Sequence, residues 1–295
     1  MRSKPAQIPL WQPDWPAPTG VRACMSTRLG GDSAPPFDSL NLGNHVGDDP
    51  VHVQRNRQTL AHALSADTAT AVRPVYLRQV HGRDVVALHA HTPDDTVADA
   101  CFTQAPHLAC TAMVADCLPV LLAHRSGRVV AAAHAGWRGL AGAGEMQGVG
   151  VLEHFFKHMP QLMHSDSSSK PTEKAAEEWQ PHEWLVWLGP CIGATAFEVG
   201  AEVRAAFLSA AHTADQQAKV TACFHPITPS VHQYKADLAG LARLRLQALG
   251  VTELYGNDSS ADWCTVRQHS LWFSHRRDSG RLGSSGRMVA CIWRS

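Results

Sequence analysis

The 295-residue sequence has no excess of charge of either sign, because 26 lysines and arginines balance 26 aspartates and glutamates. Without a basic field, the composition gives no support for nucleic acid as a partner. No apolar run reaches the roughly 18 residues of a membrane-spanning helix, so we expect no membrane partner. The proline-rich start of the chain lacks the continuous apolar segment of a secretory signal, and we therefore expect a cytoplasmic protein.

Closely spaced cysteines are missing as well. The eight cysteines are scattered, and no C-x-x-C motif occurs. In a chain without a secretory signal, this pattern favours buried thiols, with at most one functional thiolate, over a disulfide framework. No internal repeat of solenoid length is present either.

What is present is an ordinary globular composition, with 44% hydrophobic and 18% charged residues. Strand-like and helix-like stretches are mixed without a regular βαβ rhythm. We therefore predict a mixed α/β (α+β) fold in which layered mixed β-sheets are flanked by helices. We expect one domain over residues 1–295, with a Ser-, Lys-, Glu- and Pro-rich surface insertion at about 164–183.

Local patterns predict individual elements. The stretch "DDPVHVQRNRQTLAHAL" predicts a helix capped by Asp48 or Asp49. The runs "PVLLAH" and "RVVAAAH" around "RSG" predict a hairpin. Despite its glycines, residues 139–159 predict one helix, and "LWFSH" at 271–275 predicts a strand.

Three predicted strand ends carry side chains that bind transition metals. They are His81 in "LRQVHG", Cys117 in "VADCLPVLL" and His134 in "AAAHAGWRG". Two imidazoles and one thiolate suit Zn²⁺ or Cu²⁺ and leave a fourth position open for water or substrate. A second interpretation needs no metal: Cys117 is a nucleophile and His134 or His81 its base. Taken singly, each side chain is more simply a packing residue, and the residues alone leave these interpretations open.

Longer stretches carry a family resemblance: "STRLGGDSAPPFDSLNLGNHVGDDP", "LRQVHGRDV", "ADACFT", "ADCLPVLL", "HAGWRGLAGAG", "LGPCIGATAFEVG" and "FSHRRDSGRLGSSGRM". Through them the chain, from about Thr19 onward, resembles the multicopper polyphenol oxidase (laccase-domain) family, also described as a purine nucleoside phosphorylase family, and is similar to bacterial peptidoglycan editing factors. The resemblance implies that His81, Cys117 and His134 hold zinc, with copper as the alternative metal. It also implies a fold similar in shape to a bacterial toxin deamidase with a Cys-His site.

The resemblance further implies an activity. We predict a zinc-dependent purine nucleoside phosphorylase for adenosine, inosine and 5′-methylthioadenosine that also deaminates adenosine. Its partners would be a purine nucleoside and phosphate, and we take a monomer as the working expectation. For deamination, Asp116 is the nearest acid in sequence to shuttle the proton, with a structural cap as the alternative.

Three other functions stay open: a cytoplasmic cysteine hydrolase that edits peptidoglycan precursors, a copper-dependent polyphenol oxidase, and a non-enzymatic metal-binding protein. A blue-copper oxidase needs several paired H-x-H motifs. His89 and His91 form the only such pair in this sequence.

Phosphate and nucleoside need further groups. Arginine forms the bidentate pair that phosphate favours, and the candidates are Arg28, Arg138, and Arg276 or Arg277. For Arg276 and Arg277 a surface ion pair with Asp278 is the alternative. Asn41 and Gln79 are candidates to contact the base or the ribose. For both amides, hydrogen bonding to turn backbone is the commoner alternative.

Overall fold

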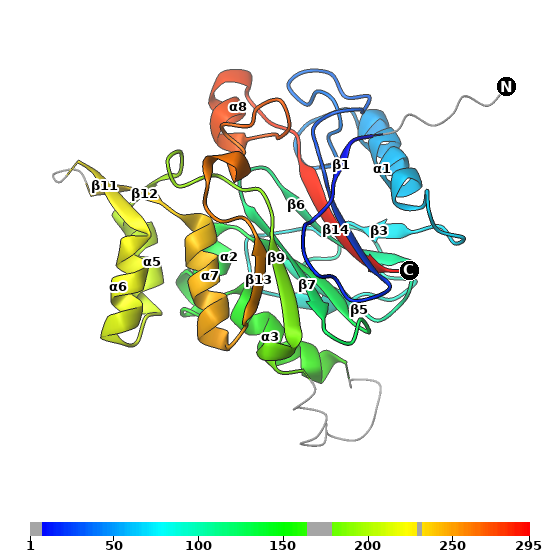
Figure 1. The fold of residues 1–295 in the computed structure, drawn as a ribbon. Coiled ribbons are helices and arrows are strands. Elements are labelled where there is room, and N and C mark those ends of the chain that lie inside the picture. The colour runs from blue at the N-terminus through cyan, green and yellow to red at the C-terminus, as the bar shows by residue number, and fades with distance from the viewer. Residues whose placement is uncertain (1–7, 164–178, 229–231) are drawn as a thin grey trace.

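The computed structural model describes residues 8–163, 179–228 and 232–295 (Figure 1). Three sheets organise it. The five-stranded sheet has the order β1 (Leu10–Trp11), β2 (Val21–Ser26), β14 (Met288–Arg294), β6 (Leu108–Val114) and β3 (Arg73–Val75). The six-stranded sheet has the order β13 (Glu253–Gly256), β9 (Trp184–Leu188), β7 (Leu118–His124), β8 (Val130–Ala135), β5 (Ala100–Thr103) and β4 (Val85–Ala87). The small sheet has the order β10 (Glu198–Gly200), β12 (Gln233–Ala236) and β11 (Phe224–Thr228).

The α-helices connect and cover these sheets: α1 (Pro50–Leu64), α2 (Trp137–Ala141), α3 (Val151–Leu162), α5 (Ala201–Ser209), α6 (Ala214–Ala222), α7 (Leu238–Leu249) and α8 (His275–Leu282). Three short 3₁₀ helices complete the elements: Gly144–Met146, Pro181–Glu183 and Ala261–Trp263. None of the described helices is long and apolar enough to cross a bilayer.

Burial explains the layering. Strands β6, β7, β8 and β9 are buried along their whole length, as expected where both faces of a strand are covered. One apolar cluster lies between the two large sheets and takes side chains from both, including Met25, Leu121 and Ile292. Helices α2 and α3 cover the outer face of the six-stranded sheet, with α7 in the same apolar cluster, and α1 covers that of the five-stranded sheet (Figure 1). Helix α5 lies further out, where it packs against α2 and α6. The order of layers is therefore helix, sheet, sheet, helix.

The predicted mixed fold is confirmed. Parallel pairs (β3 with β6, β4 with β5, β9 with β13) occur beside antiparallel ones, and β7 and β8 form the predicted hairpin. The first helix begins as predicted, since the Asp49 side chain accepts a hydrogen bond of 2.8 Å from the Val51 amide. The one-domain organisation and the likeness to a toxin deamidase stay predictions.

The single helix predicted over 139–159 was wrong. Helix α2 ends at Gly142, whose φ of 65° lies in the left-handed region, and α3 begins only at Val151. A Cβ on Gly142 would lie 2.5 Å from the Val149 nitrogen, so glycine is needed where the chain folds back on itself. The glycines thus break the helix instead of merely weakening it.

The strand predicted for "LWFSH" was also wrong. Trp272 and Phe273 are fully buried between elements, which explains why this stretch of the sequence is apolar. They belong to no strand. At Ser274 the chain already caps α8, since its hydroxyl accepts a hydrogen bond from the Arg277 amide. Of the predicted insertion, residues 164–178 lie outside the described residues, and Trp179 beyond them is buried in the core.

Candidate metal centre

His81, Cys117 and His134 come together where β7 begins and β8 ends. Their ligand atoms all lie within 4.8 Å of one another, and 3.7 Å separates Cys117 Sγ from His81 Nε2. The two imidazole rings meet edge to face, with centroids 4.8 Å apart. In the described part of the chain, no other group of three or more His, Cys, Asp or Glu side chains is this close.

Each ligand is placed by its local backbone. His134 lies in β8 opposite Pro119 of β7, so the antiparallel pairing brings it beside Cys117. His81 has a φ of 59° in the loop after β3, and Gln79 fixes this loop to β6. The Gln79 amide donates to the Met113 carbonyl at 2.8 Å and accepts from the Met113 amide at 2.7 Å.

Asp99, which sequence reasoning did not single out, holds two of the ligands in place. One carboxylate oxygen accepts from His134 Nδ1 at 2.8 Å and from the His81 amide at 3.0 Å. The other accepts from the amides of Gly82 at 2.7 Å and Val80 at 3.2 Å. The signal in the sequence was an acidic residue directly before the apolar stretch of β5. In the structure Asp99 is only 1% exposed, and a buried carboxylate needs hydrogen-bond partners.

The Asp99 contact decides which nitrogen of His134 is free. Although burial raises the pKa of Asp99, the hydrogen bond and charge of His134 bring it below the usual value. The carboxylate is therefore ionised and accepts the Nδ1 proton, which leaves Nε2 of His134 for a metal. This arrangement of carboxylate, histidine and metal recurs in zinc sites.

Gly136 keeps the centre open. A Cβ at this position would lie 2.7 Å from His81 Cδ2 and 3.1 Å from Cys117 Sγ. Any larger residue would therefore occupy the space between two ligands. The glycine of "HAGWRG" is needed for this close approach and not for its backbone conformation, because other residues also adopt its φ of −66°.

The electrostatics favour a thiolate. Burial alone would raise the pKa of Cys117, but the charge of His134 and hydrogen bonds from His134 and His81 lower it to about 6. Burial likewise opposes protonation of His134, yet the Cys117 thiolate and the Asp99 hydrogen bond raise the pKa of His134 to about 9. Cys117 and His134 therefore form a thiolate–imidazolium pair near neutral pH in the metal-free protein.

These residues fit a transition metal. The 3.7 Å between Cys117 Sγ and His81 Nε2 is close to the edge of about 3.5 Å expected for sulfur and nitrogen ligands around tetrahedral zinc. Thiolate and imidazole are ligands for zinc and copper. Three protein ligands leave the fourth position open, as in catalytic zinc sites.

Asp116 and Asn41 are both held by the protein. The Asp116 carboxylate accepts from Thr265 Oγ1 at 2.5 Å and from the Arg276 amide at 2.6 Å, in the first turn of α8. Asp116 thus has the structural capping role that the sequence analysis gave as the alternative to proton transfer. Asn41 is fully buried, and its amide bonds to Gly43, Asp48 and the Arg287 backbone.

The candidate arginines differ in their freedom, and Arg277 forms the ion pair with Asp278 that was its alternative, at 2.8 Å. All three guanidinium nitrogens of Arg28 are engaged, by the Asp38 carbonyl, the Asp38 carboxylate and the His269 carbonyl. Arg276 donates to the Glu198 carbonyl. Arg138 is exposed and lies over the Trp137 ring, 4.4 Å from its centroid. Trp137 packs against the core cluster behind α2.

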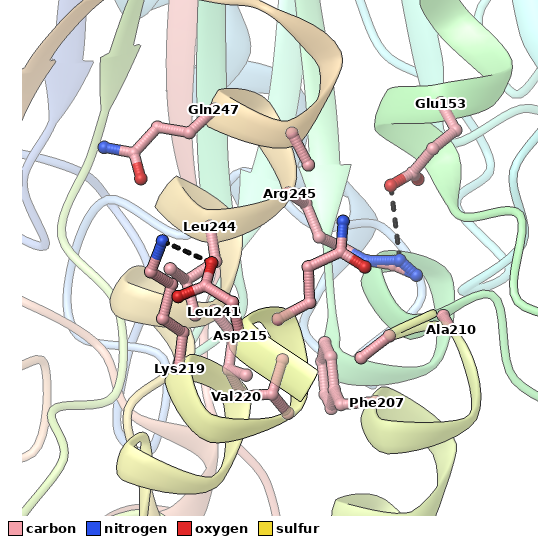
Figure 2. A pocket seen from close by; sticks show the side chains of 13 residues that line it. Glu153, Phe207, Ala210, Asp215, Lys219, Val220, Leu241, Leu244, Arg245 and Gln247 are labelled. Atoms are coloured by element: carbon pink, nitrogen blue, oxygen red, sulfur yellow. Dashed lines mark hydrogen bonds and ion pairs between the residues drawn. The ribbon is translucent and has the colours of Figure 1, made fainter. Parts of the chain in front are cut away.

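A separate cavity of about 290 Å³ lies between α3, α5, α6 and α7, and no metal ligand lines it (Figure 2). Phe207, Val220 and Leu241 form apolar walls, and an ion pair of 3.2 Å joins Glu153 to Arg245. Arg245 also donates to the Ala141 carbonyl at the end of α2. The cavity therefore lies beside Arg245, which holds the end of α2, the helix that follows His134. It is separate from the metal centre.

The comparisons place the chain in a family. It belongs to the family described as multi-copper polyphenol oxidoreductase laccase, whose model matches residues 22–295. It is 42% identical to purine nucleoside phosphorylase YfiH of Escherichia coli, over 95% of this chain and 97% of that protein. It is 44% identical to purine nucleoside phosphorylase PA4543 of Pseudomonas aeruginosa, over 95% and 96%.

Solved structures agree with this fold. Protein NMB0706 of Neisseria meningitidis is 36% identical, with a TM-score of 0.73 over 97% of this chain and 99% of that one. YlmD of Geobacillus stearothermophilus is 29% identical, with a TM-score of 0.72 over 98% and 99%. The family resemblance predicted from the sequence motifs is confirmed.

Proposed function

We propose that the chain is a zinc-dependent purine nucleoside phosphorylase that acts on adenosine, inosine and 5′-methylthioadenosine and also deaminates adenosine. The observation that carries the proposal is the convergence of His81, Cys117 and His134 with an open fourth position, braced by Asp99. The names of the relatives, purine nucleoside phosphorylases, support the reaction class. The proposal includes the cytoplasmic location and the small-molecule substrate that the sequence led us to expect.

The chain's own residues have defined roles in this proposal. His81, Cys117 and His134 would hold the metal, which supplies Lewis-acid activation of a bound oxygen ligand. Asp99 keeps His134 in the tautomer that presents Nε2 to the centre. Gly136 leaves room beside the ligands, so that the substrate can approach them.

A cysteine hydrolase acting on peptidoglycan precursors is the second candidate. A specific observation favours it, because the sequence of contacts from Cys117 through His134 to Asp99 resembles a nucleophile, base and orienting acid. The pKa of about 6 for Cys117 would supply thiolate at neutral pH.

The polyphenol oxidase alternative has less support. It would need several copper centres, whereas the described residues offer one group of ligands. His89 and His91 lie on an exposed turn.

The test is adenosine turnover with and without phosphate, with the metal content measured on the same samples. Wild-type protein and the Cys117→Ala variant are compared. Adenine formed only with phosphate, and inosine formed without it, by protein holding about one zinc per chain, would support the proposal if both activities disappear in the variant.

Two results would overturn the metal mechanism. One is a folded wild-type protein that binds no metal and converts no nucleoside. The other is full turnover by Cys117→Ala. Cell-wall precursors are then the substrates to test, with Cys117→Ala again as the inactive control for a cysteine nucleophile.

A further inference from the structure

Arg287 lies directly beside the turn that carries Cys117. It precedes β14, whose Met288 pairs with Val114 at the end of β6, two residues before Asp116. The Arg287 amide donates to Asn41 Oδ1 at 2.9 Å, and its carbonyl accepts from the Leu42 amide at 3.1 Å. The backbone of Arg287 is thus fixed between the Asn41 loop and the strand end next to the metal centre.

The side chain is equally fixed but is not neutralised. Nη1 of Arg287 donates to the carbonyls of Ser285 at 2.8 Å and Gly286 at 3.2 Å. A Cβ on Gly43 would lie 2.7 Å from Arg287 Cγ, so the loop packs against the stem of the side chain. Among the described residues, no carboxylate pairs with this guanidinium, and Nε and Nη2 have no protein partner.

A part-buried guanidinium without an ion pair is costly, because burial removes water and no anion in direct contact replaces it. Burial accordingly lowers the pKa of Arg287, and the anionic groups that oppose this are Cys117 and Asp116. Both belong to the turn at the metal centre, and Asp116 already caps α8. Because the pairing of β14 with β6 places Arg287 next to this turn, and only Nη1 donates to the protein, its remaining nitrogens are available to an anion at the metal centre.

We propose that Arg287 binds the phosphate co-substrate at the metal centre, an inference that rests on the phosphorylase activity proposed above. Arginine offers the parallel N–H donors that match phosphate oxygens. In the reaction, a phosphate oxygen forms a bond to C1′ of the ribose while the bond from C1′ to the purine nitrogen breaks. The electron pair of that bond leaves with the purine, and the proton of hydrogen phosphate ends on it.

The other candidate arginines are less suited. Arg28 has every guanidinium nitrogen engaged by the protein. Arg138 stacks on Trp137 at the exposed surface of α2. The stretch "GSSGRM" is typical of a turn before a strand, and only the pairing of β14 with β6 brings Arg287 to the site.

The experiment compares wild type with Arg287→Gln and Arg287→Lys, and with Arg281→Gln as a matched control on the exposed end of α8. Initial rates of hypoxanthine release from inosine are measured against phosphate concentration, with zinc content and melting temperature on the same samples. For Arg287→Gln we expect KM for phosphate to rise about 10- to 100-fold, while KM for inosine changes less than about twofold. Arg287→Lys should lie between, and the control should match wild type.

An unchanged KM for phosphate in a folded, zinc-loaded Arg287→Gln protein would overturn the inference, and if this variant does not fold, Arg287→Lys decides by the same criterion. If wild-type protein releases no hypoxanthine at any phosphate concentration, the proposed function fails first. Binding of inorganic phosphate, measured by ³¹P line broadening, then tests the site separately. Weaker binding by the Arg287 variants supports an anion site, and equal binding by all four proteins overturns it.

Discussion

Asp99→Asn is the most direct test of how the metal centre is built. The substitution keeps the shape of the side chain but removes its charge and turns one acceptor oxygen into an NH₂ donor. Asp99 accepts from one imidazole and three backbone amides, so at least one of these donors would then face another donor. Both the orientation of His134 and the loop that carries His81 depend on this carboxylate.

The expected magnitudes follow from these contacts. A hydrogen bond to a charged group contributes about 1.5–3 kcal/mol, so the metal-free variant should lose about 3 kcal/mol of unfolding free energy. Removing the carboxylate behind a ligand histidine typically weakens metal binding about 10- to 100-fold. Because the pKa of Asp99 is lowered in the folded state, its contribution to stability is present above about pH 4 and is lost as the pH falls through the folded value.

The assay is zinc titration against a competing chelator, together with urea unfolding of the metal-free protein at pH 7 and at pH 3.5. Asp14→Asn, at an exposed position, is the matched control. Zinc affinity within about threefold of wild type, in a variant that unfolds at the same urea concentration, would refute the role assigned to Asp99.

Three further predictions concern the same region and its support. In metal-free protein, alkylation of Cys117 by iodoacetamide should reach its plateau by about pH 7 and gain little between pH 7 and 9, because the pKa of Cys117 is about 6. A thiol of ordinary pKa, about 8.5, would gain about 25-fold over the same interval. Gly136→Ala should fold but bind no zinc, since its Cβ would lie 2.7 Å from His81 Cδ2 and push that ligand away. Gly280→Ala in α8, whose Cβ would have no atom within 4 Å, should keep full zinc content and stabilise the protein by about 1 kcal/mol in urea unfolding. Arg245→Met should cost about 3 kcal/mol because it leaves the Glu153 carboxylate unpaired beside the cavity, and adding Glu153→Leu should restore most of that loss in the same measurement; additive losses would contradict the ion-pair argument (Figure 2).

The sequence patterns that succeeded were those with a local physical cause. Asp49 and Pro50 began a helix because a carboxylate cap and a proline suit its first turn. Continuous apolar runs gave β7, β8 and β9 because strands covered on both faces need apolar residues on both. The run "LWFSH" misled because a buried loop before a helix is just as apolar.

The sequence by itself determined the ligand types and the family: a histidine, a cysteine and a second histidine, each in a recognisable motif. The strand end predicted for His81 was wrong, because β3 ends at Val75 and His81 lies in the loop that follows. Only the tertiary structure decided what surrounds the three ligands. Asp99 reaches His134 through the pairing of β5 with β8, and Arg287 reaches the Cys117 turn through the pairing of β14 with β6. Local sequence encodes which side chains are available, but long-range strand pairing sets their distances, and distance decides both the charge state of a thiol and the fit of an anion.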